Sequence, residues 1–410
     1  MTLATRRRIG DLLDEARTSK RLIEDTVEAA HRATGNNQRS WGQFLDAAPG
    51  VPQTGIYGTG AAIEILSDSN HSPSLPEAMD RLPGTVAAHA VTNRFDESDL
   101  DLTFKCVSII EALEPGRSNL TRVEEVELRL RSVIENRPGW GYHYCAGAPD
   151  PSSRILPTAL VLGALSRSPS FRESAEYRNA VEWLAGEVSS VGTVSALEKA
   201  FALIAFCRNS QWALGFNGVS NAIQQLSLDL SAWANNRDSS LVGTHQQVHY
   251  WVPSPTPGRN HYMFYPTDLI VSWALLASDK FDLAAGHTTY VVRHIIRSVT
   301  TSGALTSVST GRQSITDALW AHKVLNIFIE KAENSPARFV PPLINTIEGT
   351  TSRRVATSVV LLLLALAMTI AATKSAEDNL VLLAAFTVSA ALAGALLAAA
   401  WWEWIRGRSG

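Results

Sequence analysis

Two carboxylates two residues apart, Asp99 and Asp101, directly precede an apolar helix that is predicted to open at Thr103. A carboxyl that is buried beside a second carboxylate can stay protonated at neutral pH, so the pair is a candidate for acid–base chemistry. Carboxylates in the first turn of a helix also interact favourably with its dipole. A simple helix start is therefore the more ordinary interpretation of both residues.

Aromatic side chains gather at the openings of several predicted apolar helices. An aromatic wall suits a prenyl chain or a polycyclic hydrocarbon, and its π faces can stabilise a carbocation. Most buried aromatic residues simply fill a core, so only several of them facing one cavity would indicate a binding site. The candidate ligand-binding residues are Tyr57, Phe104, Trp140, Tyr142, Tyr144, Tyr262, Phe264, Tyr265, Trp273 and Trp320.

The sequence lacks the residue patterns typical of metal sites, nucleotide-binding sites and nucleophilic catalysis. The 3 cysteines have no paired metal spacing, and we expect no disulfide. His245 and His249 are spaced as on one helical face, but the Trp and Pro residues that follow, up to His261, predict a long loop instead. There is no phosphate-binding Gly-rich loop with Lys and no nucleophile-elbow serine. We expect neither a metal nor a cofactor.

A unit that recurs about every fifty residues between residues 40 and 330 carries these candidates. Each unit has an amphipathic segment, a loop with Gly and often Trp, and a short apolar helix. The apolar helices are predicted to open near Thr59, Thr103, Pro157, Lys199, Pro266 and Thr316, and the clearest amphipathic segments are 120–136, 174–189, 219–236 and 281–300. Helices that are apolar nearly all round must be buried on all sides, whereas amphipathic helices must bury only one face, which predicts an inner and an outer layer. An open α-solenoid would satisfy the same pattern.

The clearest repeat, GWGYHYCAGAPDPSSRILPTALVLGAL at 139–165, resembles the repeat of the terpenoid cyclase and protein prenyltransferase superfamily. The resemblance implies an all-α fold, a six-repeat α/α toroid of inner and outer helices. Asp99 and Asp101 match the first two acidic positions of the Asp-x-Asp-Asp motif of class II terpene cyclases, in which the middle Asp is the proton donor. Leu102 stands in the third position, so the motif is incomplete. No Asp-x-Cys occurs, which argues against a zinc prenyltransferase.

Two uncharged apolar runs, 355–373 and 380–402, follow the repeats and are separated by a short polar link. Each is long enough to cross a hydrocarbon core of about 30 Å, and a link of this length can only turn the chain back. Arg353 and Arg354 before the runs and Arg406 and Arg408 after them favour cytoplasmic ends. The sequence thus predicts a cytosolic domain at 1–340, a linker at 341–354, a transmembrane hairpin at 355–402 and a cytosolic tail at 403–410. A buried hairpin in a soluble core is the alternative.

The net charge of -3 lacks the basic excess of a nucleic-acid binder. We expect a multi-pass protein of the inner, cytoplasmic membrane, with both termini cytoplasmic. Its toroid would bind a hydrophobic ligand, isoprenoid or lipid-like, in a central cavity. Catalysis stays undecided because the acid motif is incomplete; an enzyme of this kind would be a class II cyclase-like isomerase or lyase.

A non-enzymatic sensor or effector is the alternative function. In that case the cytosolic toroid would control a hairpin that perturbs the membrane. Ala390 and Gly394 form a small-xxx-small step that would let two copies of the second run pack closely. The expected partners are the lipid bilayer, a hydrophobic small molecule or lipid, and a second copy of the chain.

Overall fold

The computed structural model divides the chain into two compact units, Met1–Phe339 and Val340–Gly410. It describes residues 3–34, 38–46, 56–67, 107, 110–112, 124, 126–128, 130–131, 137–141, 153–190, 194–236, 246–253, 260–308 and 310–339, all of them in the first unit. The predicted linker, membrane hairpin and tail lie outside these residues. Within them, no helix combines the length and apolar character needed to cross a bilayer.

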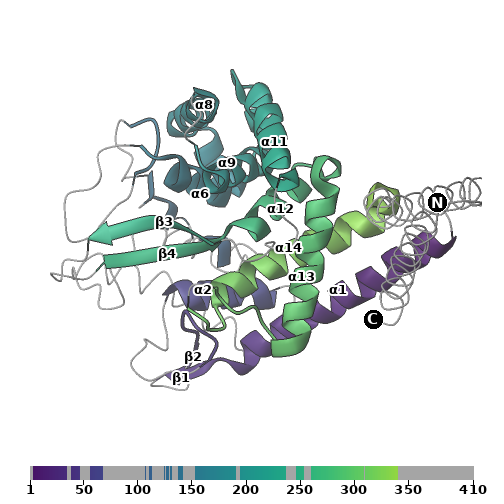
Figure 1. The fold of residues 1–410 in the computed structure, drawn as a ribbon. Coiled ribbons are helices and arrows are strands. Elements are labelled where there is room, and N and C mark those ends of the chain that lie inside the picture. The colour runs from purple at the N-terminus through teal and green to yellow at the C-terminus, as the bar shows by residue number, and fades with distance from the viewer. Residues whose placement is uncertain are drawn as a thin grey trace, which may run out of the picture. The chain divides into compact units, whose positions relative to one another are not determined.

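The described residues are mostly helical, as the sequence predicted (Figure 1). The longer helices are α1 (Leu3–Ala29), α2 (Ile56–Ser67), α6 (Ile155–Ala164), α8 (Ala175–Ser190), α9 (Ala196–Arg208), α11 (Val219–Asn235), α12 (Thr267–Ala277), α13 (Ala285–Ser302) and α14 (Ile315–Asn334). Shorter helical turns are η1 (Leu165–Arg167), α7 (Pro169–Arg172), α10 (Ser210–Ala213), η3 (Phe281–Ala284) and η4 (Pro336–Phe339). Residues 107, 110–112, 124, 126–128, 130 and 131 are also helical.

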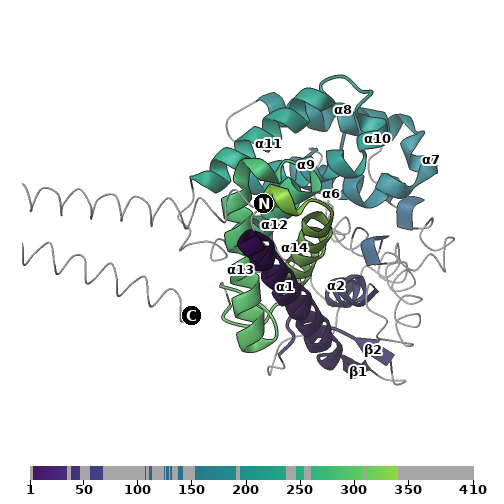
Figure 2. The same cartoon turned by 90° about the vertical axis from the view of Figure 1, so that its right-hand side faces the viewer.

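The helices α2, α14, α12, α9 and α6 contact one another in this order and carry much of the core. The helices α1, α8, α11 and α13 pack against them from the outside: α8 on α6 and α9, α11 on α9 and α12, α13 on α12 and α14, and α1 on α14 and α2 (Figure 2). Side-chain burial follows this division. In α6 almost every residue is buried, whereas α8 and α11 alternate buried and exposed positions at helical spacing. Burial in these helices therefore follows the pattern expected of an inner and an outer layer.

Two copies of one hydrogen-bonded clasp mark the start of inner helices. The backbone N–H of Trp140 donates to Thr158 Oγ1 at 2.8 Å, and the indole of Trp140 donates to the Leu130 carbonyl at 2.9 Å. Trp41 repeats both bonds, with Thr59 Oγ1 at 3.2 Å and with the Val27 carbonyl at 2.6 Å. Each clasp ties the loop before an inner helix to that helix and to the preceding outer segment. The first unit of the repeat thus begins before residue 40, because it includes α1.

A β-hairpin stands where the sequence predicted a long loop. Strands β3 (Gln246–Pro253) and β4 (Asn260–Pro266) pair antiparallel, with a register shift between Val248 and Tyr250. The loop prediction was wrong because the Trp and Pro residues were read as turn signals. Pro253 lies at the end of β3, where a missing N–H disturbs the ladder least. A shorter hairpin, β1 (Arg32–Thr34) with β2 (Gln38–Ser40), follows α1.

Candidate functional site

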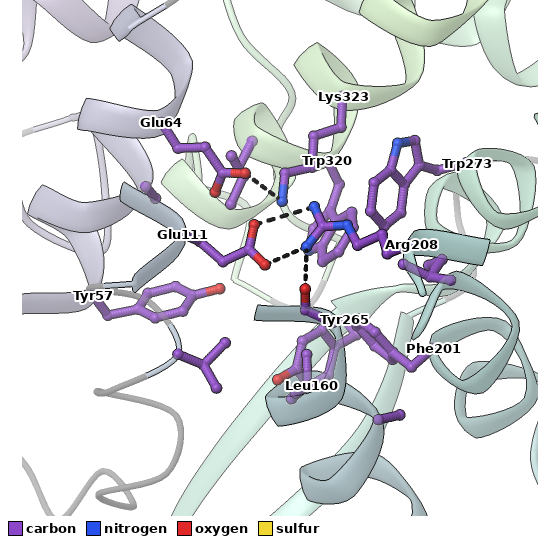
Figure 3. A pocket seen from close by; sticks show the side chains of 16 residues that line it. Tyr57, Glu64, Glu111, Leu160, Phe201, Arg208, Tyr265, Trp273, Trp320 and Lys323 are labelled. Carbon is purple, nitrogen blue, oxygen red and sulfur yellow. Dashed lines mark hydrogen bonds and ion pairs between the residues drawn. The ribbon is translucent and has the colours of Figure 1, made fainter. Parts of the chain in front are cut away.

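A pocket with a cavity volume of about 70 Å³ opens between the inner helices (Figure 3). Its lining comes from α2, from the helical residues Val107 and Glu111, from α6, α9 and α14, and from the β4–α12 junction together with α12. These six segments are the ones in which the sequence predicted apolar helices. Residues from all six predicted apolar regions therefore meet at one pocket.

One part of the pocket wall is aromatic. Phe201 lies 5.5 Å from both Tyr265 and Trp320, measured between ring centroids, and meets each edge to face. Trp320 lies 5.4 Å from Trp273 in the same manner. Tyr57 completes the aromatic lining from α2. Edge-to-face contacts of this kind add to the stabilisation from burial, so the wall is a packed cluster.

The other part of the wall is charged and consists of two ion pairs. Lys323 Nζ lies 2.6 Å from Glu64 Oε1. Arg208 donates to both carboxylate oxygens of Glu111 and also to the Gly163 carbonyl, at 3.2 Å in the last case. We name these four charged residues the charged quartet. Fully ionised, the quartet carries no net charge.

The two cations of the quartet also contact the aromatic wall. Lys323 Nζ lies 4.8 Å from the ring centre of Trp320 and 5.2 Å from that of Trp273. The Arg208 guanidinium lies 5.3 Å from the Trp273 ring centre. A cation over an indole face is stabilised by the ring quadrupole. The aromatic and charged parts of the wall therefore support one another.

Burial changes the acidity of two pocket residues. It raises the pKa of the Glu64 carboxyl above its ordinary value; the Lys323 ammonium opposes this shift and the Glu111 carboxylate adds to it. Burial also raises the pKa of the Tyr57 hydroxyl to about 12, against the effect of a hydrogen bond with Thr316. Tyr57 is therefore neutral at physiological pH, and it adds no charge to the pocket.

Contacts along the helices show that neighbouring inner helices run in the same direction. Tyr57 bonds to Thr316 where α2 and α14 begin, and Glu64 pairs with Lys323 about two turns further along both helices. The pair α9 and α12 follows the same order, with Phe201 against Tyr265 first and Arg208 against Trp273 later. In consequence, Glu64, Lys323 and Arg208 lie further along their helices than Tyr57 and Tyr265 do.

The structure brings together four of the ten predicted ligand-binding residues. Tyr57, Tyr265, Trp273 and Trp320 line the pocket. Trp140 does not: it is buried in the clasp, where its ring packs 5.9 Å from Phe171. Its indole is held by the Leu130 carbonyl in the core, so the aromatic wall of this pocket does not include it.

The remaining predicted site residues are not placed at the pocket. Tyr262 and Phe264 lie on β4, where their backbones pair with those of Trp251 and Val248. The positions outside the described residues are Phe104, Tyr142, Tyr144 and the candidate acids Asp99 and Asp101.

Sequence reasoning missed the charged quartet and Phe201. The signal was present in two of the helices: Glu64 interrupts the apolar segment of α2, and Lys323 lies among apolar residues of α14. A lone charge on a helix that is apolar nearly all round must be paired if it is buried. Looking for pairs of opposite sign among such charges would have found Glu64 and Lys323.

Metal binding finds no support in the described part of the chain, where no group of three His, Cys, Asp or Glu side chains could hold an ion. His249 and His261 lie on paired strands and not on one helix. Burial raises the pKa of the Cys207 thiol to about 12, which makes it a poor ligand and nucleophile.

Comparison with known proteins found no matching family model, no matching curated protein and no matching solved structure.

Proposed function

We propose that residues 1–340 form a six-repeat α/α toroid whose central pocket binds a hydrophobic ligand, isoprenoid or lipid-like. The observation that carries this proposal is the common pocket, to which all six predicted apolar helical regions contribute. The contact between α2 and α14, the first and the last of the predicted apolar helices, supports ring closure over an open solenoid. The resemblance of residues 139–165 to terpenoid cyclase repeats supports the same fold.

The size of the pocket restricts the ligand. An engineered cavity of about 150 Å³ in another protein takes up benzene, whereas this pocket measures about 70 Å³. A polycyclic hydrocarbon would have to displace much of the aromatic wall. A short or linear apolar group needs only a small movement of side chains, so we restrict the proposal to ligands that present such a group.

Binding is the proposed activity, and proton donation is not part of it. The carboxyls at the pocket are Glu64 and Glu111, and each is paired with a cation. Burial raises the pKa of Glu64 even beside Lys323, but one of its carboxylate oxygens is engaged by Lys323, so we propose a binding role for this carboxyl and assign it no proton transfer. Asp99 and Asp101 are proposed as acids only by their resemblance to the cyclase motif.

We place the protein in the inner membrane through the two apolar runs at 355–373 and 380–402. Their length and the flanking arginines support this anchor. An anchored toroid would meet an apolar ligand where such ligands concentrate, in the bilayer. Membrane extraction of the full chain and protease access from each side of the membrane test the anchor and its orientation.

A ligand titration tests the pocket. The full chain in detergent is titrated with short prenyl alcohols by ligand-observed NMR, for the unmodified protein, Trp273→Leu and Trp233→Leu. Trp273 lines the pocket, whereas Trp233 lies on the outer helix α11 against His287. We expect Trp273→Leu to weaken binding about tenfold, the effect of losing roughly 1.4 kcal/mol of contact. Equal affinities in both variants, or no binding to the unmodified protein, would contradict the proposal.

The second candidate is a non-enzymatic effector that acts on the membrane. The paired state of both pocket carboxyls favours it over an enzyme, because ligand binding without chemistry suits a sensor. The full chain reconstituted in dye-loaded vesicles should then release dye when the pocket ligand is added. Vesicles that stay sealed with and without ligand would rule this function out.

A further inference from the structure

We propose that the pocket selects a ligand whose polar end is an uncharged hydroxyl, held between Glu64 and Lys323, in preference to an anionic or cationic end. The inference rests on the proposed function and specifies its ligand class: a short apolar alcohol. It follows from the charge balance of the quartet, from the hydrogen-bonding capacity that Glu64 and Lys323 retain, and from the aromatic wall beside them.

The charge balance comes first. Glu64 and Lys323 form one ion pair and Glu111 and Arg208 form the other. Their side chains are mostly covered, with 17% of Glu64 and 13% of Lys323 exposed. A ligand that brought its own charge would leave one unbalanced charge in this covered site, which is costly. A neutral ligand keeps the balance.

Hydrogen-bonding capacity then selects among neutral groups. Glu64 Oε1 accepts from Lys323, and the two oxygens of a carboxylate offer about four acceptor sites, so Glu64 can accept a further hydrogen bond. The Lys323 ammonium has three N–H donors and uses one of them on Glu64. A group that donates to the carboxylate and accepts from the ammonium satisfies both. A hydroxyl does this with one atom.

The aromatic wall places the rest of the ligand. Lys323 Nζ lies over the rings of Trp320 and Trp273, and Trp320 continues the wall to Phe201. A hydroxyl bound at Lys323 therefore has an apolar surface directly beside its carbon chain. A cavity of about 70 Å³ suits a chain of a few carbons. The site would thus bind an alcohol through both its hydroxyl group and its carbon chain.

A series of ligands with one apolar body tests the inference. Prenol, senecioate, prenylamine and 2-methylbut-2-ene share the same branched carbon skeleton and end in a hydroxyl, a carboxylate, an ammonium and no polar group. Each is titrated into the full chain in detergent at neutral pH by ligand-observed NMR. We expect prenol to bind at least about tenfold more tightly than each of the other three. Senecioate or prenylamine binding as tightly as prenol would overturn the inference.

Charge-removing variants make the test specific to the quartet. Glu64→Gln leaves Lys323 without its anion and should shift the preference to senecioate. Lys323→Met leaves Glu64 without its cation and should shift it to prenylamine. The control is Asp229→Asn, which breaks the ion pair of Asp229 with Lys199 outside the pocket and should leave the order unchanged. A merely structural ion pair would weaken all ligands alike and produce no such opposite shifts.

The outcomes separate the two proposals. If none of the four ligands binds, the proposed function and this inference both fail. If ligands bind and Trp273→Leu weakens them, but the charged ligands are preferred, the pocket stands and the inference fails. Where a quartet variant does not fold, the order of the four ligands on the unmodified chain still decides.

Discussion

The hydroxyl of Thr158 accepts a hydrogen bond from the backbone N–H of Trp140, 18 residues earlier, and donates one back to the Trp140 carbonyl at 3.1 Å. Thr59 and Trp41 have the same separation and the same two bonds. One threonine thus closes the loop before each of two inner helices. The repeat that the sequence suggested is therefore also a repeat of hydrogen bonds, including in the first unit, where the sequence similarity is weak.

Removing the Thr158 hydroxyl should destabilise the protein. Thr158→Val keeps the side-chain shape but leaves the buried N–H of Trp140 without its acceptor, a cost of about 1–3 kcal/mol in unfolding free energy. Thr158→Ser keeps the hydroxyl and loses only a buried methyl group, so it should cost less. Urea unfolding of the full chain measures both. A valine variant as stable as the serine variant would show that the clasp contributes little.

Two glycines should respond to alanine in opposite directions. A Cβ on Gly58 would lie 2.3 Å from the Gly42 carbonyl oxygen, a contact with backbone that cannot move aside easily. Gly58→Ala should therefore cost about 2 kcal/mol or more, as overpacking does. Gly186 lies within α8 with no atom within 4 Å of an added Cβ, and Gly186→Ala should stabilise the helix by roughly 0.5–1 kcal/mol. Thermal unfolding of the two variants, monitored by circular dichroism, should shift in opposite directions.

The Glu111–Arg208 pair should show a measurable coupling energy. Glu111→Leu or Arg208→Met leaves a partly buried charge without its partner, and the double variant leaves none. Because 27% of the Arg208 side chain is exposed, we expect a coupling of about 1 kcal/mol, at the low end for contacting residues. It is measured by a double-mutant cycle in urea.

An exposed ion pair provides the control for that cycle. Lys331 pairs with Asp279, of which 56% of the side chain is exposed, and its coupling should stay below about 0.5 kcal/mol. Equal coupling energies for the two pairs would show that the pocket pair gains nothing from its surroundings.

Acid should weaken the contact between α1 and α14. Burial acts to raise the pKa of Glu24, but hydrogen bonds from His322 and Lys20 outweigh it and lower the pKa below the ordinary carboxyl value of 4.5. A carboxyl with a lowered pKa in the folded state stabilises the fold above its unfolded pKa, and this contribution is lost as pH falls through the folded pKa. Glu24→Gln should thus destabilise the protein at pH 6, with the difference from the unmodified chain shrinking below about pH 4.

The pH series has its own control. Glu176 lies on the outer helix α8 with 44% of its side chain exposed, and its pKa is lowered chiefly by a hydrogen bond from its own backbone N–H. Glu176→Gln should change the unfolding free energy by less than about 0.5 kcal/mol at either pH. A Glu24→Gln difference that stays constant with pH would mean that packing, and not ionisation, accounts for its effect.

Local pattern was sufficient to predict most of the helices. The outer segment predicted at 174–189 is α8 at Ala175–Ser190, and the one at 219–236 is α11 at Val219–Asn235. Helical periodicity is a local property, because each amphipathic face depends on residues three and four positions apart. The β3–β4 hairpin was missed because Trp251 and Pro253 were read as turn signals, although the aromatic and β-branched residues around them favour a strand.

In the candidate pocket, some features follow from local sequence and others only from the packing of residues that are distant in the chain. The sequence by itself determined that apolar helices carrying Tyr57, Trp273 and Trp320 would be buried, since their exposure to water is unfavourable whatever they pack against. Only the tertiary structure decided that Glu64 meets Lys323 and that Arg208 meets Glu111, because these partners lie far apart in the chain. Opposite charges stabilise one another only over a few ångströms, and the packing of the helices sets that distance.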